Sequence, residues 1–166
     1  MYRAYLSAKL GLPYAFASHF APHILMNAIM YYRENFWPSV ALAAPYVIAG
    51  DNAFVVDTEA KAALLVSSHF HWVNMLYKGR PGPLPYPNIG YLASLSDHEK
   101  QRIQQALAYS IFGDKTQGRT VAVGFTARTG ADELILGARI HNPAARCRSS
   151  QLLAEALSCM MVNSVI

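Results

Sequence analysis

The chain has 166 residues, which suits a single domain spanning residues 1–166 with a substantial core. Hydrophobic residues make up 53% and charged residues only 14%, against a usual charged share of about 25%, so we expect an exposed apolar face that binds something. The net charge of +4 is mild, and the scattered Lys and Arg residues argue against a nucleic-acid partner.

The first third of the chain reads as a helix, a strand, a helix and a second strand. The first helix, residues 1–10, is already under way at Met1, so we expect a preceding segment. Gly11 and Pro13 end that helix, and an apolar strand follows over residues 13–19. A helix over residues 22–36 leads to a strand over residues 45–56, in which Gly50 indicates a bulge or a close backbone approach.

The middle of the chain is predicted to hold two helices separated by a long loop. Thr58 caps the first helix, which ends at Gly79. Its core-facing residues are expected at a helical spacing: Ala63, Leu64, Ser67, Trp72, Met75 and Leu76. Four prolines within residues 79–92 exclude a regular element and predict a lid-like surface loop. Ser96 and Glu99 then form a capping box for a helix that continues to about Ala108.

The last third completes an alternating pattern of strands and helices. Residues 119–126 are β-branched enough for a strand, but their place before Gly130 favours a helix that ends at that glycine. A strand over residues 132–140 and a helix over residues 144–161 follow. The fold class is therefore α/β, with about three parallel strands and flanking helices.

Polar residues that follow strands are the candidate site residues. Ser18 and His19 follow the first strand, and His141 and Asn142 follow the last, at the carboxyl ends where parallel α/β proteins build their sites. The more common alternative for a single histidine at such a place is simple packing. No phosphate-binding glycine loop or nucleophile elbow is present.

Two other polar pairs are poor site candidates. His69 and His71 have metal-ligand spacing for a strand, but in a helix their side chains diverge by about 200°, so we expect no metal site. Asp132 and Glu133 are strand neighbours that point to opposite faces, so they do not form a carboxylate pair.

The cysteines and the hydropathy pattern indicate the compartment. Cys147 and Cys159 lie twelve residues apart in the last predicted helix, so no disulfide is expected. Because no signal peptide and no apolar stretch of about 18 residues is present, we expect a cytoplasmic protein with no membrane partner.

Four motifs, in order and spacing, resemble the bacterial luciferase-like flavin-dependent monooxygenase family: GLPYAFASHFAP, PYVIAGDN, GRPGPLPYP and TGADELIL. The resemblance covers nearly the whole chain. It implies the carboxyl-terminal half of a (β/α)8 barrel, with the three strands as the sixth, seventh and eighth. It also implies that the turn holding the flavin phosphate, and the strands cradling much of the flavin ring, lie before Met1.

The resemblance assigns roles to individual residues. It implies FMN as cofactor, with His19 beside the flavin ring and Ser18 and Phe20 as further flavin-binding residues. It also implies an active-site lid at residues 79–87. The expected pocket and lid residues are Asn52, Arg80, Tyr86, His141 and Asn142. Two features depart from the family: Asn142-Pro143 replaces an Asp-His pair, and Gly118 and Gly124 stand in a helix that relatives fill with strong helix formers. Both indicate relaxed constraint on catalysis.

Three functional interpretations follow. The chain is a luciferase-like oxidoreductase component, completed by a homo-oligomer or by a chain supplying the other half-barrel and served by a flavin reductase. Alternatively, it is a non-catalytic binding or assembly module that keeps the fold, or a truncated fragment. Three parallel strands cut from a barrel would expose unpaired edges, which favours association in the first two cases.

Overall fold

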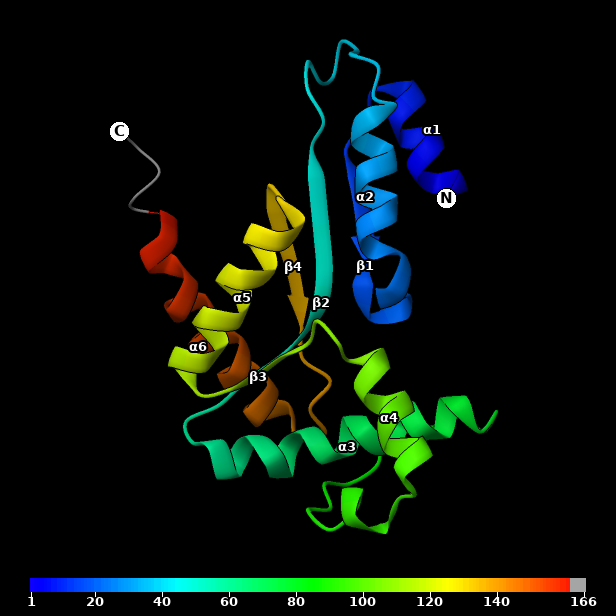
Figure 1. The fold of residues 1–166 in the computed structure, drawn as a ribbon. Coiled ribbons are helices and arrows are strands. Elements are labelled where there is room, and N and C mark those ends of the chain that lie inside the picture. The colour runs from blue at the N-terminus through cyan, green and yellow to red at the C-terminus, as the bar shows by residue number, and fades with distance from the viewer. Residues whose placement is uncertain (162–166) are drawn as a thin grey trace.

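The computed structural model describes residues 1–161, with side chains through Ser158, as a parallel sheet with helices packed around it (Figure 1). The helices and strands are α1 Tyr2–Leu10, β1 Tyr14–Ala17, α2 Leu25–Glu34, β2 Val47–Val55, α3 Glu59–Tyr77, α4 Asp97–Ala106, β3 Ile111–Gly113, α5 Lys115–Thr129, β4 Glu133–Gly137 and α6 Pro143–Met161. Short 3-10 turns cover Ser18–Phe20, Pro22–Ile24 and Leu92–Ser94.

The long strand β2 is the centre of the sheet. β1 pairs with it in parallel from Tyr14 opposite Val47, and β4 pairs with it in parallel from Glu133 opposite Ile48. Because β1 and β4 both pair with residues 48–50 of β2, they occupy its two opposite edges. The expected parallel α/β arrangement is therefore confirmed.

A short fourth strand adds to the three that the sequence predicts. β3 pairs in parallel with the last three residues of β2, with Ile111 opposite Ala53. It has only three residues, too few to show an alternating or β-branched pattern, so the sequence reads as a connection between two helices.

The two faces of the sheet are unlike each other. Alternate residues point to one face and pack against α1, α2 and α5: Tyr14, Val47, Ala49 and Leu134 belong to this core, with Tyr32 and Phe125 from the helices. The residues between them, such as Ile48 and Ile135, point to the opposite face, where Ile135 is 57% exposed. No helix among residues 1–161 covers this second face along β1, β4 and residues 48–50 of β2, and we call this uncovered part the inner face; α3 packs against the same side of β2 only further along, at Phe54.

Specific local interactions fix the helix ends. Thr58 caps α3, and capping boxes begin both α4, at Ser96, and α5, at Asp114. Gly11 and Gly130 adopt left-handed backbone conformations at the ends of α1 and α5. The helix predicted over residues 119–126 is thus confirmed as part of α5.

Two expectations about local packing are wrong. The buried face of α3 carries Ala62, Leu65, Val66, Ser67, Ser68, His69, Val73 and Asn74, whereas Leu64 and Leu76 are exposed. The reason is that α3 packs Ala62, Leu65 and Val66 against Phe54 at the end of the sheet and buries several polar residues beside them. Gly50 sits in a regular strand, where an added Cβ would make only ordinary contacts, so it marks neither a bulge nor a close approach.

The proline-rich loop over residues 79–92 is fastened to α3. The Trp72 indole donates a hydrogen bond to the Gly82 carbonyl at 3.1 Å, and the Asn88 amide donates to the Ser67 hydroxyl at 2.8 Å. The His71 and Tyr91 rings stack with centroids 4.2 Å apart. Its role as a lid stays a prediction.

Among the residues described here, no helix is both long and apolar enough to cross a membrane.

Candidate functional site

The inner face holds an open groove of about 420 Å³. Ala15, Ala17, Ile48 and Gly50 supply its floor, and polar residues gather beside the ends of β1 and β4: His19, Asp51, Asn52 and Arg139. A groove of this volume falls within the range of about 300 to 1,000 Å³ that small-molecule sites occupy.

A buried hydrogen-bond network fixes the centre of this polar end. The Asp51 carboxylate accepts hydrogen bonds from the hydroxyls of Ser18 and of Ser110, the latter at 2.9 Å. It also accepts one from the backbone amide of Asn52 at 2.6 Å. The Ser18 hydroxyl also lies 2.9 Å from the Gly50 carbonyl oxygen. These donors satisfy both oxygens of the buried Asp51 side chain.

His19 lies between this network and the groove. Its ring centroid is 4.3 Å from that of Phe20, and its Nδ1 is buried with no hydrogen-bond partner among the described residues. Burial is the main influence that lowers the pKa of His19, while the Asp51 charge raises it and Arg139 lowers it. His19 is therefore favoured as a neutral imidazole near pH 7.

His69, a residue of α3, lies in the same region of the molecule as His19. Its side chain is only 2% exposed and lies between the rings of Phe54 and Trp72, with centroids 5.2 Å and 5.9 Å away. Neither ring nitrogen has a hydrogen-bond partner among the described residues. Burial lowers the pKa of His69 to about 3, and Arg139 and His19 add to this effect.

Arg139, just after β4, lines both the groove and a smaller cavity. Its guanidinium lies 4.2 Å from the centroid of the Trp72 ring, a cation-π contact. The smaller cavity, which we call the inner cavity, has a volume of about 60 Å³ and is lined by His19, Asn52, His69, Trp72 and Arg139 among others. Neutral imidazoles, an amide and a guanidinium thus converge at the carboxyl ends of three strands.

No family model matches the chain. Curated proteins do: "Luciferase-like monooxygenase" of Escherichia coli K12 is 38% identical over 155 residues, covering 93% of this chain and 46% of that protein. The Bacillus subtilis protein YddN, which is uncharacterized, is 36% identical and covers 92% of this chain and 45% of its own. The chain is homologous to half of a luciferase-like monooxygenase.

Solved structures of two proteins resemble the fold of this chain. Apo-MsnO8 superposes with a TM-score of 0.75 at 26% identity, over 93% of this chain and 47% of its own. The monooxygenase RslO1 of Streptomyces bottropensis, at 14% identity and a TM-score of 0.59, shows likeness of fold alone. The chain spans about half the length of these proteins, so its α/β sheet corresponds to part of a luciferase-like barrel.

The structure brings some of the residues predicted by this resemblance together. His19 and Asn52 line both the groove and the inner cavity. Ser18 is fully buried and directed at Asp51, so its hydroxyl positions the network instead of facing the groove. Phe20 lines the inner cavity but is 72% exposed overall.

The predicted lid residues lie outside the groove. Tyr86 stacks on His141 with ring centroids 4.1 Å apart, and Arg80 is exposed on the loop. Neither Arg80, Tyr86 nor His141 lines the groove or the inner cavity. The contact between Tyr86 and His141 instead attaches the loop to the segment between β4 and α6.

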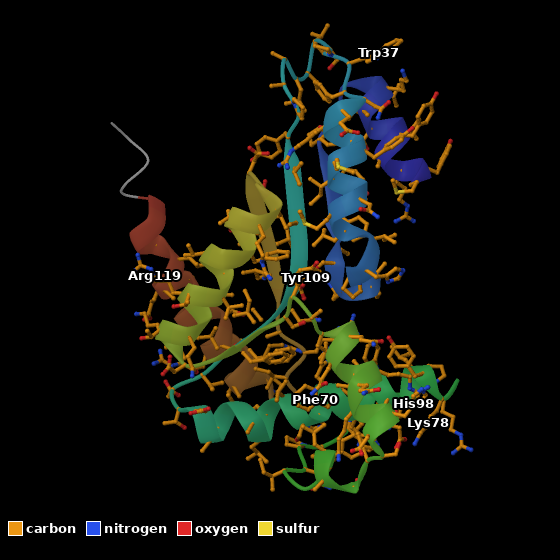
Figure 2. The ribbon with its side chains drawn as sticks, viewed as in Figure 1. Trp37, Phe70, Lys78, His98, Tyr109 and Arg119 are labelled. Atoms are coloured by element: carbon orange, nitrogen blue, oxygen red, sulfur yellow. The ribbon has the colours of Figure 1, made fainter. Side chains whose placement is uncertain are left out.

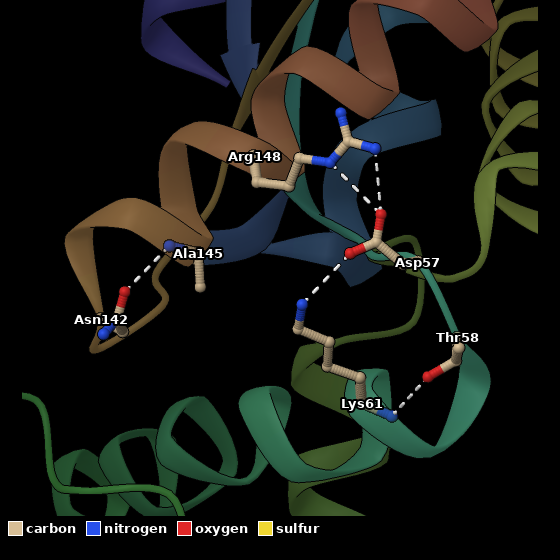
Figure 3. Close-up of polar contacts among 6 residues, drawn as sticks. All are labelled: Asp57, Thr58, Lys61, Asn142, Ala145 and Arg148. Atoms are coloured by element: carbon tan, nitrogen blue, oxygen red, sulfur yellow. Dashed lines mark hydrogen bonds and ion pairs between the residues drawn. The ribbon is translucent and has the colours of Figure 1, made fainter.

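Asn142 has a structural role at the start of α6. Its side-chain oxygen accepts a hydrogen bond from the Ala145 amide at 2.9 Å and so caps α6 (Figure 3). Nearby, Asp57 accepts hydrogen bonds from Arg148 at 3.0 Å and from Lys61 at 3.1 Å, which joins the start of α3 to α6. These contacts place Asn142 in the scaffold around the site.

Sequence reasoning missed three residues of the site. Asp51 lies inside the PYVIAGDN motif, and a carboxyl group within an otherwise apolar buried strand is a signal that could have found it. Arg139 ends a strand predicted correctly and follows the same rule. His69 was weighed only as a metal ligand with His71, and the structure gives the two rings separate aromatic neighbours, Phe54 and Trp72 for one and Tyr91 for the other.

Proposed function

We propose that the chain supplies one wall of a flavin-dependent monooxygenase site of the luciferase type. The observation that supports this most is a groove on an uncovered sheet face, whose polar end is built by the strand termini of a luciferase-like half-barrel. In this proposal the chain corresponds to the carboxyl-terminal half of the barrel, with β1, β2 and β4 as its sixth, seventh and eighth strands.

The residues present suit a flavin along the groove. Small side chains at Ala15, Ala17 and Gly50 leave room for a flat ring system against the strands, and His19 stands at its polar end. FMN, when bound and reduced, would supply the electrons that activate dioxygen. The neutral His19 imidazole would hydrogen-bond an oxygen or nitrogen atom of the bound molecules, because its Nδ1 has no partner in the part of the chain that the structure describes.

Completion of the site requires a second wall opposite the inner face. We propose that another copy of the chain, or a polypeptide carrying the other half-barrel, covers this face and that a flavin reductase supplies reduced FMN. The exposed Ile135 and the strand edges favour such a cover, since apolar surface and unpaired edges are stabilised by burial.

A flavin titration of the His19→Ala variant tests the proposal. Oxidised FMN, and anaerobically the reduced form, should bind the purified chain saturably, as measured by flavin fluorescence. Replacement of His19 should raise the dissociation constant by about three- to tenfold, the loss of roughly one hydrogen bond. His98→Ala, an exposed histidine on α4 (Figure 2), is the matched control and should leave binding unchanged.

Absence of binding in both redox states, in the chain alone and with its completing partner, would contradict the proposal. The second candidate, a non-catalytic assembly module, predicts a stable oligomer with no flavin affinity. The uncovered inner face favours it equally, so the flavin titration separates the two.

A further inference from the structure

Arg139 is a cation that forms no ion pair with the side chains that the structure describes. None of the ion pairs among residues 1–158 involves it, whereas Arg148 and Lys61 share Asp57 and Lys78 pairs with Glu99 at 2.6 Å. Its guanidinium lies over the Trp72 ring. Stacking of this kind uses the flat face of a guanidinium and leaves the N–H groups at its edge available to a ligand.

Trp72 holds that guanidinium in a defined place. Its indole nitrogen donates to the Gly82 carbonyl at 3.1 Å, which fixes the ring between α3 and the loop. The ring is also nearly parallel to that of His69, with an interplanar angle of 14°. Arg139, Trp72 and His69 therefore form a preorganised group and do not depend on a flexible surface side chain.

His69 contributes an unsatisfied hydrogen-bonding group to the inner cavity. A neutral imidazole has one N–H donor and one acceptor nitrogen, and at 2% exposure neither is hydrated from bulk water. Neither nitrogen has a hydrogen-bond partner within residues 1–158. Leaving such groups unpaired costs free energy, so a molecule that accepts a hydrogen bond inside the cavity is favoured.

The size and the charge of the inner cavity limit what it can hold. Its volume of about 60 Å³ corresponds to roughly two water molecules, enough for a functional group of a few heavy atoms. Asp51 does not line it, and the Asp51 oxygens accept hydrogen bonds from Ser18, Ser110 and the Asn52 amide. The lining is thus rich in donors, with one full positive charge.

We propose that the inner cavity binds one oxyanion group, such as a carboxylate, sulfonate or phosphate, with Arg139 as the charged donor and His69 as the neutral donor. Oxyanion binding itself does not depend on flavin chemistry. Assignment of the group to a monooxygenase substrate rests on the proposed function, and the alternative source of the same chemistry is the phosphate of FMN.

Trp72 fluorescence provides a direct readout. The chain has two tryptophans, and Trp37 lies at the tip opposite α3 and α4 (Figure 2), so a Trp37→Phe background leaves Trp72 as the reporter. Titration with sodium sulfate, phosphate and acetate at constant ionic strength should give a saturable change. A response that is linear in salt for all three anions would overturn the proposal.

Substitutions then assign the response to the cavity. Arg139→Gln should weaken sulfate binding at least tenfold, and Arg139→Lys should recover part of it because the charge returns without the planar fork. His69→Phe keeps a ring between Phe54 and Trp72 and should weaken binding about threefold or more. Unchanged affinity in both Arg139 variants would refute the assignment, with thermal unfolding followed by circular dichroism showing that the variants are folded.

Arg128→Gln is the matched control. Arg128 also lies over an aromatic ring, that of Tyr109 at 5.4 Å, but it is exposed on α5 and lines neither the groove nor the inner cavity. Sulfate affinity should not change in this variant. An equal loss at Arg128 and Arg139 would show a nonspecific charge effect and overturn the proposal.

Competition between sulfate and flavins identifies the source of the group. If the cavity takes the FMN phosphate, sulfate should weaken FMN binding and leave riboflavin binding unchanged. If it takes a substrate group, saturating sulfate should leave both flavins unaffected. Sulfate binding without any flavin binding would retain this inference while contradicting the proposed function, so the two can fail separately.

Discussion

At the scale of single residues, the burial of polar groups at the ends of the strands decides the chemistry. Asp51 is surrounded by three donors and His69 by aromatic rings, although both lie within one small region of the molecule. The carboxyl group of Asp51 has its hydrogen bonds satisfied, whereas burial keeps the His69 imidazole neutral. The site therefore combines a hydrogen-bonded carboxyl group with neutral imidazoles.

The neutral burial of His69 makes stability depend on pH. The unfolded chain takes up a proton at His69 near pH 6.5, but the folded chain resists until about pH 3, so stability is greatest above pH 6.5 and is lost as pH falls towards 3. At pH 5 the expected loss from this group is about 2 kcal/mol. Urea unfolding at pH 7.5 and pH 5.0 measures it.

His69→Phe isolates the contribution of this histidine. The variant should lose about 2 kcal/mol less than the parent between pH 7.5 and pH 5.0, because it has no proton to bind there. Carboxylates titrate mainly below this range, so they affect both proteins alike. Equal pH dependence in the two proteins would show that His69 is accessible to protons in the folded state.

At the scale of elements, the two unusual glycines of α5 have different explanations. The sequence interpretation treated Gly118 and Gly124 alike, as a sign of relaxed constraint. The structure corrects this for Gly118, which is buried where an added Cβ would lie 2.5 Å from Cγ2 of Val55 in β2. Gly118 thus allows α5 to approach the sheet closely, while nothing lies within 4 Å of a Cβ at Gly124.

Alanine at the two positions should therefore have opposite effects. Gly118→Ala should destabilise the fold by about 1 to 3 kcal/mol, because the crowding at the fully buried Val55 exceeds the gain in helix propensity. Gly124→Ala should stabilise it by up to about 1 kcal/mol through propensity alone. Urea unfolding of both variants checks this pair, and stabilisation at Gly118 would mean that α5 can move away from β2.

At the scale of the whole molecule, the uncovered inner face is the dominant feature. Helices bury one face of the sheet, while Ile135 on the other face remains 57% exposed beside the groove. In a closed barrel such residues pack against the opposite strands, so burial of this face would stabilise the chain further.

A charge on the inner face should weaken association. If the face is an interface, the purified chain should form an oligomer at micromolar concentration, and Ile135→Glu should shift it towards the monomer in light scattering. Val123→Glu, a control at a 37% exposed residue of α5, should leave the assembly state unchanged. A monomeric parent chain, or an oligomer insensitive to Ile135→Glu, would contradict self-association through this face.

Much of the fold could be predicted because its signals are local. The caps at Thr58 and Ser96 and the glycine at position 130 act within one helical turn, so they fix helix ends whatever packs around them. The resemblance to luciferase-like proteins also survives as motifs along the chain. Of the strands, only β3 could not be predicted, because three residues are too few to show a strand-like alternation of side chains.

The site needed the tertiary structure because its residues are far apart in sequence. His19, Asp51, His69 and Arg139 come from four segments, and only the parallel pairing of β1, β2 and β4 brings three of them to one edge of the sheet. The sequence by itself determined the alternation of strands and helices, which depends on neighbours in the chain. The tertiary structure decided which polar groups are buried, because burial depends on which segments meet.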